Sequence, residues 1–344
     1  MYLTELETQF RGQLDAFQPD VIHVWGTEYG HTLAMVNAAG TAGRLDNLVV
    51  SIQGLCSVYA GHYAEGVLER IQRGSTFRDL VRRDNIVKQR EKFVLRGVLE
   101  VEALRKARHI IGRTDWDLAC VRQINPKAEY HFCNETLRQP FYQGAWRYDS
   151  CRKHRIFASS CAYPVKGFHY LLEAFGQIVK TYPDATLAVP GKSFLTASKL
   201  RRTNYQKYLA ALAARYGVED KIEFLGSLSA EEMKQAFLDA NVFVLPSTIE
   251  NSPNSLGEAM LLGVPCVAAD VGGVTTMLRH GLEGEVYPSA APYMLAFYVE
   301  TIFARGEAAE AMGAAARAHA GVTHDQEKNL ADLLEIYKSL ATEG

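Results

Sequence analysis

The chain has 344 residues, of which 48% are hydrophobic, so it can bury a full core. Two domains are expected, because single cores rarely grow beyond about 250–300 residues. A formal net charge of −2 argues against a dedicated nucleic-acid binder, which would carry a strong basic excess. The acidic start of the sequence and the lack of any apolar run near about 18 residues predict a cytoplasmic protein with neither a signal nor a membrane span.

The first half of the chain alternates short apolar runs with amphipathic ones, although less regularly than the second half. Strands are expected at 21–25, 48–53 and 109–112, and helices near 31–39 and 84–107. Residues 1–150 are therefore expected to form an abbreviated α/β domain, and a linker to the rest of the chain is expected at 143–153.

Arginine and lysine are abundant between residues 70 and 108, with too few acids to balance them. The run includes Arg82, Arg83 and Arg90. Such a run is typical of a solvated helix face, but it also fits docking to an anionic membrane surface or to a phosphate-bearing lipid acceptor. Both interpretations stay open from the sequence.

From residue 155 onward, apolar runs and amphipathic segments alternate as they do in strand–helix–strand units around a parallel sheet. The expected strands are 155–159, 186–189, 221–224, 242–245, 266–269 and 284–287, and the expected helices are 168–182, 198–216 and 230–240. Together they predict one doubly wound α/β domain at 151–322. The tail at 323–344 carries Leu330, Leu333, Leu334 and Tyr337 at helical spacing, so it should form a helix that buries one face, with the first domain as the expected partner.

The most informative segment is residues 246–260, where a loop of small polar residues follows an apolar strand and enters a helix. Glu250 and Glu258 flank this loop with seven residues between them. Free backbone N–H groups and the positive end of a helix suit an anion such as a diphosphate. Each glutamate could then accept hydrogen bonds from hydroxyl groups on one side of that anion, such as those of a sugar or a ribose.

Further motifs accompany this loop. They are Leu262-Gly263-Val264-Pro265, Val271-Gly272-Gly273, His280-Gly281-Leu282-Glu283-Gly284 and, upstream, Tyr163-Pro164-Val165-Lys166-Gly167-Phe168. In this order of strands, glycine turns and helices, the chain resembles family 4 of the retaining glycosyltransferases, within the glycosyl transferases group 1. The resemblance implies a GT-B fold, which consists of two doubly wound Rossmann-like domains. It also implies transfer of a sugar from a nucleotide diphosphate sugar to a hydroxyl acceptor.

The resemblance further implies the residues of a donor site. Lys166 would contact the donor phosphates, Glu250 would position the sugar and Glu258 would hold the ribose, so catalysis is assigned to Glu250 and Lys166. Other donor-binding residues are expected on the loop and at two glycine turns, namely Ser252, Asn254, Ser255, Leu256, Gly191 and Gly226. The donor is expected to be of UDP or GDP type and serves as a co-substrate, so no cofactor is predicted.

Three departures from the family pattern are visible. Cys161 stands where an arginine commonly helps to neutralise the diphosphate, and Gln53 stands where many relatives carry a histidine. Before the strand at 21–25 the family would place one more strand–helix–strand unit with a glycine-rich turn, and none is expected here. Acceptor-side residues are expected after the ends of first-domain strands, at Glu28, His31, Gln53, Tyr59, His62 and Arg113.

Asp115-Trp116-Asp117 has the spacing of the metal-binding aspartates of single-domain (GT-A) glycosyltransferases. It also directly follows a predicted strand, and Thr114 with Asp117 fits a helix-opening capping box. The capping interpretation is preferred, so no metal is predicted. The six cysteines lack any Cys-x-x-Cys pair and likewise predict reduced thiols instead of structural zinc.

The sequence thus predicts a retaining, metal-independent glycosyltransferase, with a role in bacterial surface polysaccharide or glycolipid synthesis. Its partners would be a nucleotide sugar and a hydroxyl acceptor such as a sugar, a lipid-linked glycan or a small molecule. Peripheral contact with an anionic membrane and homo-oligomerisation are further expectations. The alternative is a non-catalytic sugar-nucleotide-binding subunit that needs a partner, which Cys161 and the lacking N-terminal unit favour. A nucleotide-sugar epimerase of the same architecture fits less well.

Overall fold

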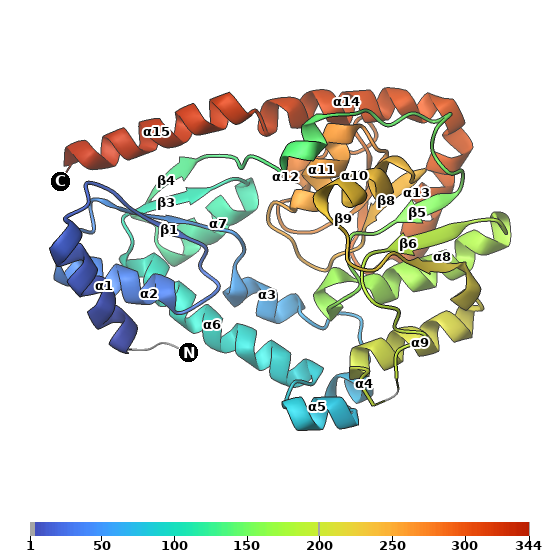
Figure 1. Cartoon of the computed structure of the whole chain (residues 1–344), viewed down its shortest axis with the longest axis horizontal. Helices are drawn as coiled ribbons and strands as arrows, with labels where there is room; N and C mark the ends of the chain where they lie inside the picture. The colour runs from blue at the N-terminus through green and yellow to red at the C-terminus, as the bar shows by residue number, and fades with distance from the viewer. Residues whose placement is uncertain (1–3, 199, 344) are drawn as a thin grey trace. The chain divides into compact units, whose positions relative to one another are not determined.

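The computed structural model describes residues 4–198 and 200–343, and it divides into two compact units (Figure 1). The first unit comprises Met1–Gly61, Glu91–Thr136 and Thr323–Gly344, and the second comprises His62–Arg90 and Leu137–Val322. Each unit is built around one parallel sheet. Within the described residues, no helix combines the length and the apolar character needed to cross a membrane.

The first unit holds a four-stranded parallel sheet in the order β1-β2-β3-β4. Its strands are β1 (Ile22–Trp25), β2 (Leu48–Ser51), β3 (His109–Gly112) and β4 (Glu129–Phe132). Its helices are α1 (Thr4–Phe17), α2 (His31–Thr41), α3 (Cys56–His62), most of α6 (Ile86–Lys106), α7 (Asp115–Ile124) and α15 (Gln326–Glu343).

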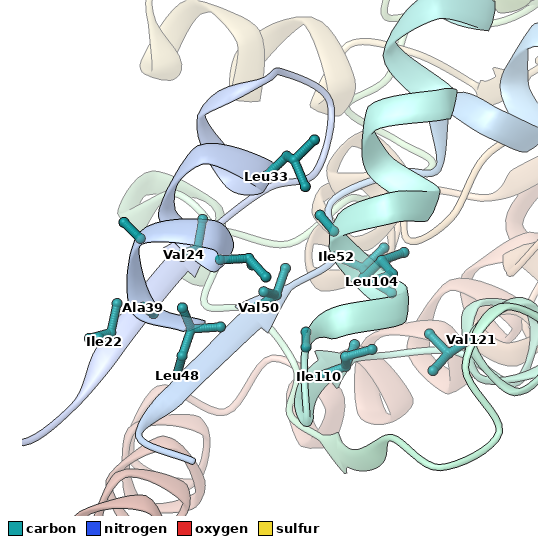
Figure 2. Packing of buried hydrophobic residues seen from close by; sticks show 14 of the residues in the cluster. Ile22, Val24, Leu33, Ala39, Leu48, Val50, Ile52, Leu104, Ile110 and Val121 are labelled. Carbon is teal, nitrogen blue, oxygen red and sulfur yellow. The ribbon is translucent and has the colours of Figure 1, made fainter. Parts of the chain in front are cut away.

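The central strands β2 and β3 of the first unit bury apolar side chains on both faces, as expected for parallel strands covered on both sides. Figure 2 shows side chains such as Val24 and Val50 meeting Leu33 and Leu104 from the helices on one face. On the opposite face, Val49 and Ile111 pack against Ile336 and Leu340 of α15. Because successive strand residues point to opposite faces, neighbouring residues of one strand serve both layers.

Helix α15 carries the apolar face expected of the tail, but with a different set of residues. Ile336 and Leu340 are buried, and Leu333 and Tyr337 pack against their cluster. Leu330 and Leu334, in contrast, are exposed. Their side chains lie on a stripe of the helix next to the buried stripe. The helical spacing of apolar residues alone does not tell these two stripes apart.

The second unit holds a six-stranded parallel sheet in the order β10-β9-β8-β5-β6-β7. Its strands are β5 (Arg155–Phe157), β6 (Thr186–Val189), β7 (Ile222–Phe224), β8 (Val242–Leu245), β9 (Cys266–Asp270) and β10 (Glu285–Pro288). The chain builds the sheet outward from β5 in one direction through β7 and from β8 in the other through β10. The order therefore reverses between β5 and β8, and in such sheets ligands bind at the carboxyl ends of the strands beside that reversal.

Helices cover both faces of this sheet, as expected for a doubly wound domain. The helices of the second unit, including α4 and α5, which pack on α9, are α4 (Glu69–Arg73), α5 (Phe77–Arg82), α8 (Phe168–Thr181), α9 (Asn204–Tyr216), α10 (Ala230–Leu238), α11 (Asn254–Leu262), α12 (Val274–Met277), α13 (Pro292–Arg305) and α14 (Ala309–Thr323). Short 3-10 turns stand at Gln139–Tyr142, Pro164–Lys166, Glu219–Lys221 and Gly306–Ala308.

The predicted strands are confirmed within one or two residues, whereas some other elements differ from the sequence prediction. The helix expected at 198–216 begins only at Asn204, because Thr203 and Gln206 form a capping box there. The strand β4 was missed, because its residues Glu-Tyr-His-Phe lack the apolar run expected of a buried parallel strand. Helices α1, α4 and α5 were also not predicted.

The charged segment 62–90 groups with the second unit because it packs on the start of α9. The carboxylate of Asp79 is buried, and it accepts a hydrogen bond from the backbone N–H of Asn204 at 2.8 Å. Thr76 donates through its hydroxyl to the carbonyl of Arg202 at 2.8 Å. One acid of this basic stretch thus holds α5 to α9.

Thr114 and Asp117 form the predicted capping box at the start of α7. Asp117 is fully buried and accepts hydrogen bonds from the backbone N–H of Arg113 at 3.0 Å and from the hydroxyl of Tyr130. Asp115 is exposed on the same turn. The two aspartates thus have different surroundings, and Asp117 acts in the structure as a helix cap.

We expect Asp117→Ala to lower the free energy of unfolding by about 2–4 kcal/mol, since it leaves buried donors without an acceptor. Asp115→Ala, the matched control on the same turn, should cost below about 1 kcal/mol, the usual size of a helix-dipole interaction. Urea unfolding followed by circular dichroism measures both. Equal losses for the two variants would contradict the capping role.

Candidate functional site

The candidate site of the second unit lies at the carboxyl ends of β5 and β8, where the strand order reverses. β8 runs directly into the loop 246–253, and α11 begins at Asn254. The turn Pro164–Lys166 follows β5 and ends at Gly167. These two connections carry the two residues that the sequence assigned to catalysis.

Two glycines allow the backbone to approach the loop from both sides. A Cβ on Gly167, whose φ is +63°, would lie 1.7 Å from the carbonyl oxygen of Pro246. A Cβ on Gly272, whose φ is +53°, would lie 1.9 Å from the carbonyl oxygen of Glu250. Only glycine fits at such positions, so the loop is held between the turn after β5 and the turn after β9.

This clamp brings Lys166 and Glu250 together. The Lys166 ammonium contacts the Glu250 carboxylate at 2.6 Å, and the Ser247 hydroxyl donates to the same oxygen at 2.7 Å. Glu250 is buried, while more than a third of the Lys166 side chain is exposed. The lysine side of the pair is therefore partly open to solvent, while its carboxylate is kept inside the loop.

Glu258 is buried on the second turn of α11 and is paired with Arg138. The guanidinium donates to both carboxylate oxygens, at 2.6 Å and 2.8 Å, a bidentate geometry that fixes the carboxylate plane. The Arg138 guanidinium also lies 4.7 Å from the ring centroid of the buried Phe141. Sequence reasoning missed Arg138, because no motif marks the stretch before the linker.

The start of α11 supplies the remaining predicted loop residues. Pro253 is the N-cap, and no side-chain hydrogen bond caps this end of the helix. Asn254 is exposed, and Ser252 and Ser255 are partly buried. Leu256 is fully buried, and its N–H donates to the carbonyl of Pro253 at 2.9 Å. Leu256 therefore supports the helix start from the core, and the first turn leaves its polar residues at the surface.

Gly191 and Gly226 stand after β6 and β7, and they pair with each other. The N–H of Gly191 donates to the carbonyl of Gly226 at 2.7 Å, and both residues have positive φ. The space where a Cβ would stand is open at both positions. This pair lies on the carboxyl side of the same sheet, on the β5 side of the reversal.

Cys161 lies buried between β5 and the Lys166 turn. Burial raises the pKa of its thiol to about 11, so the side chain is neutral at pH 7. It therefore supplies no positive charge where the family pattern has an arginine.

The predicted acceptor-side residues separate into three groups. Gln53 and Arg113 converge on Glu135 of the first unit, each at 2.6 Å from one carboxylate oxygen. His62 belongs to the second unit, where its carbonyl accepts a hydrogen bond from Thr248 at 2.9 Å. The remaining three belong to the first unit, and they are Glu28, His31, which contacts the carbonyl of Trp25, and Tyr59, which packs near Trp116.

Arg113 and Glu135 line a pocket of about 280 Å³ at the carboxyl ends of the first unit's strands. Arg113 is buried and also donates to the carbonyl of Ile52 at 2.9 Å. Trp25, half exposed at the end of β1, forms one wall of the pocket. No sequence motif assigned a role to Glu135, which follows the missed strand β4.

Because Glu258 is buried, the interaction between Arg138 and Glu258 should have a measurable coupling energy. In a double-mutant cycle with Arg138→Met and Glu258→Gln, we expect a coupling of about 1–3 kcal/mol, as for a charged hydrogen bond with one buried partner. The exposed Arg147–Asp149 pair, at 3.8 Å, is the control and should couple by less than about 1 kcal/mol. Chemical unfolding of the four proteins of each cycle gives the values. Similar couplings for both pairs would show that Arg138 does not fix Glu258.

Residues 152–319 match the sequence model of the family described as glycosyl transferases group 1. Among curated proteins, the chain is 29% identical over 178 residues to the D-inositol 3-phosphate glycosyltransferase of Corynebacterium urealyticum. That stretch is 52% of this chain and only 41% of the relative, so the chain spans less than half the length of this relative.

Solved structures resemble the chain over nearly its whole length. Sucrose-phosphate synthase from Thermosynechococcus elongatus has a TM-score of 0.73 at 18% identity, covering 98% of this chain and 78% of its own. HepE of Anabaena in complex with UDP-glucose has a TM-score of 0.70 at 17% identity, covering 98% and 82%. At such identities the likeness concerns the fold alone, and it confirms the predicted GT-B architecture of two Rossmann-like domains. The family similarity thus covers residues 152–319, and the likeness to solved structures extends the GT-B fold to nearly the whole chain.

Proposed function

We propose that the chain is a retaining glycosyltransferase of family 4, which transfers a sugar from a nucleotide diphosphate sugar to a hydroxyl acceptor. One observation carries the proposal. At the strand-order reversal of a group 1 domain, the Lys166–Glu250 pair and the buried Glu258 flank the uncapped start of α11. An anion site between two carboxylates suits a diphosphate that joins two hydroxyl-rich groups.

The phosphates would lie at the start of α11. Its first N–H groups point out of the helix and, with the positive end of the helix dipole, attract an anion. The side chain of Lys166 is partly exposed next to this loop, so its ammonium would contact the leaving diphosphate. Ser252, Asn254 and Ser255 would add donors from the loop and the first helical turn. Charge that develops on the leaving group would thus be stabilised by groups that the fold already holds in place, without a cofactor.

The two glutamates would divide the hydroxyl groups of the donor. Glu250 would contact the sugar beside the reacting carbon, and Glu258 would accept from the ribose hydroxyls. Arg138 would act as a positioning residue, because it fixes the plane of the Glu258 carboxylate. Gly191 and Gly226 would leave room for the base on the β5 side of the reversal. A UDP or GDP donor is proposed, and the UDP-glucose complex of HepE supports the first.

The acceptor would attack the anomeric carbon from the face that the diphosphate leaves, which retains the configuration. The pocket around Arg113 and Glu135, with Gln53 beside it, is the proposed acceptor side. A role in surface polysaccharide or glycolipid synthesis in the cytoplasm remains part of the proposal.

A non-catalytic sugar-nucleotide-binding subunit is the second candidate. The neutral, buried thiol of Cys161 favours it, since one cation of the family pattern is lacking next to the phosphates. Such a subunit would bind the nucleotide with the same residues but would not transfer the sugar of the donor. Turnover therefore separates the two candidates.

The proposed transferase should release free nucleotide from UDP-glucose or a GDP-hexose only when a hydroxyl acceptor is present. Glu258→Ala should weaken nucleotide binding about 10- to 100-fold, the value of one charged hydrogen bond. Glu250→Gln should lower turnover about 100-fold and change nucleotide affinity little, because its contact differs between ground and transition states. Calorimetric titration with free nucleotide and a coupled release assay measure both effects.

The exposed Glu219→Gln variant of the same unit is the control and should match the parent protein. An acceptor screen should include hexoses, inositol phosphates and lipid-linked sugars. A product with retained anomeric configuration by NMR supports the transferase, and an inverted product would overturn the retaining mechanism. Nucleotide binding without release in any acceptor mixture would favour the non-catalytic subunit instead.

We also propose that α5 docks the protein on an anionic membrane. Phe77 and Val81 are 64% and 67% exposed on this helix, and Arg82 lies between them and the exposed Arg83. Leu200 is 66% exposed, and it lines the same surface hollow as Phe77, Val81 and Arg82 of α5. Apolar side chains flanked by arginines are typical of segments that insert shallowly into an anionic interface.

Sedimentation with anionic vesicles should therefore occur at low salt and weaken as salt screens the attraction. Charge reversal at Arg82, Arg83 and Arg90 should abolish it. The same reversal at the exposed Arg122, Lys127 and Lys338 is the control with equal net charge, and it should leave binding nearly unchanged. Salt-insensitive binding, equal losses in both triple variants, or no binding would leave α5 as a solvated surface.

A further inference from the structure

Two histidines and a glutamate meet on adjacent strands of the first unit. In the parallel pairing of β3 with β4, His109 is opposite Glu129 and Ile111 is opposite His131. Because side chains alternate between the faces of a strand, His109, Glu129 and His131 share the face to which Ile111 points. His109 and Glu129 are the first residues of β3 and β4, and His131 is the third residue of β4, whereas the pocket around Glu135 is at the carboxyl ends.

The atoms of these side chains that can bind a metal lie close together. His109 Nδ1 is 3.1 Å from His131 Nε2, and the Glu129 carboxylate oxygens lie 3.6 Å from the first and 4.0 Å from the second. Ligand nitrogens bound at about 2.0–2.1 Å to a tetrahedral zinc ion stand roughly 3.3 Å apart. The histidine pair already has this spacing. The two distances from Glu129 involve different oxygens of its carboxylate, and one ligand atom from each of the three residues lies within 4.8 Å of the others, so the carboxylate has to turn toward the histidines to bind the same ion.

We propose that His109 Nδ1, His131 Nε2 and the Glu129 carboxylate bind a divalent transition-metal ion of the zinc class. Two imidazoles and one carboxylate favour zinc and its neighbours over magnesium or calcium, which take oxygen ligands. Water would complete a tetrahedron. Half of the Glu129 side chain is exposed, which gives the ion a route from solvent, and the buried His109 is fixed by the sheet.

The metal-free state is compatible with the same geometry. A ring nitrogen of one histidine can donate to the other across the 3.1 Å contact, and the rings stack with centroids 5.3 Å apart. An ion would replace that shared proton and link β3 to β4. Backbone pairing sets the register of the two strands and holds all three residues next to one another, so the ion requires only side-chain adjustments.

The test uses the full chain after treatment with a chelator. Zn²⁺ is titrated by calorimetry and Co²⁺ by visible absorption. We expect one binding equivalent and a tetrahedral cobalt spectrum without the charge-transfer band of a thiolate ligand. His131→Gln and Glu129→Gln should each weaken Zn²⁺ binding at least about tenfold, the usual cost of losing one ligand interaction. His154→Gln, which alters a histidine paired with Asp184 at the surface of the second unit, should bind as the parent does.

Three outcomes would overturn the site: no Zn²⁺ binding by the parent protein, binding that both ligand variants retain, or a cobalt spectrum dominated by thiolate bands. Circular dichroism monitors the fold of each variant. Glu129 is half exposed at the first position of β4, so Glu129→Gln should fold even where His131→Gln does not. Its titration alone then decides the proposal.

Discussion

The backbone of the loop 246–250 lies between two glycine turns, and the candidate donor site depends on this close approach. Gly167 faces the carbonyl of Pro246 and Gly272 faces the carbonyl of Glu250, at distances where no side chain fits. The carboxylate of Glu250 therefore has a fixed position before any ligand binds. The ammonium of Lys166 is brought to it by the same turn that contains Gly167. A geometry set by backbone contacts is more rigid than one set by long side chains, and preorganised charge of this kind is what electrostatic catalysis requires.

The charges of this site are balanced in the absence of a donor. Lys166 neutralises Glu250, and Arg138 neutralises Glu258. A diphosphate would add negative charge next to two pairs that have no surplus cation, since Cys161 is neutral. The start of α11 would then have to contribute more of the stabilisation, or Lys166 would have to bridge the carboxylate and a phosphate. This charge balance bears on both the transferase and the non-catalytic subunit, because a site with weak anion stabilisation can bind a nucleotide and still transfer sugar slowly.

The sequence predicted the second unit better than the first, for physical reasons. Each strand of the second sheet is an apolar run bounded by glycine or polar residues, and the periodicity of the helices between them is clear. In the first unit, β4 carries charged and polar side chains, and α15, a helix far along the chain, covers one face of the sheet at β2 and β3. The loop motif located Glu250, Lys166 and Glu258. The roles of Arg138 and Glu135 could not be predicted from the sequence. Each depends on a partner more than 20 positions away, whereas spacing rules concern near neighbours.

Helix α15 also constrains the order in which the chain can fold during synthesis. It supplies Ile336 and Leu340 to a cluster with Val49 and Ile111, so one face of the first sheet stays uncovered until this helix has left the ribosome. Residues 137–322 of the second unit are synthesised before it and need nothing from it for their own sheet. The unit that begins first is thus completed last. During that interval its exposed apolar face is open to aggregation or chaperone binding, and a ribosome-bound chain would show the second unit protected from proteolysis before the first.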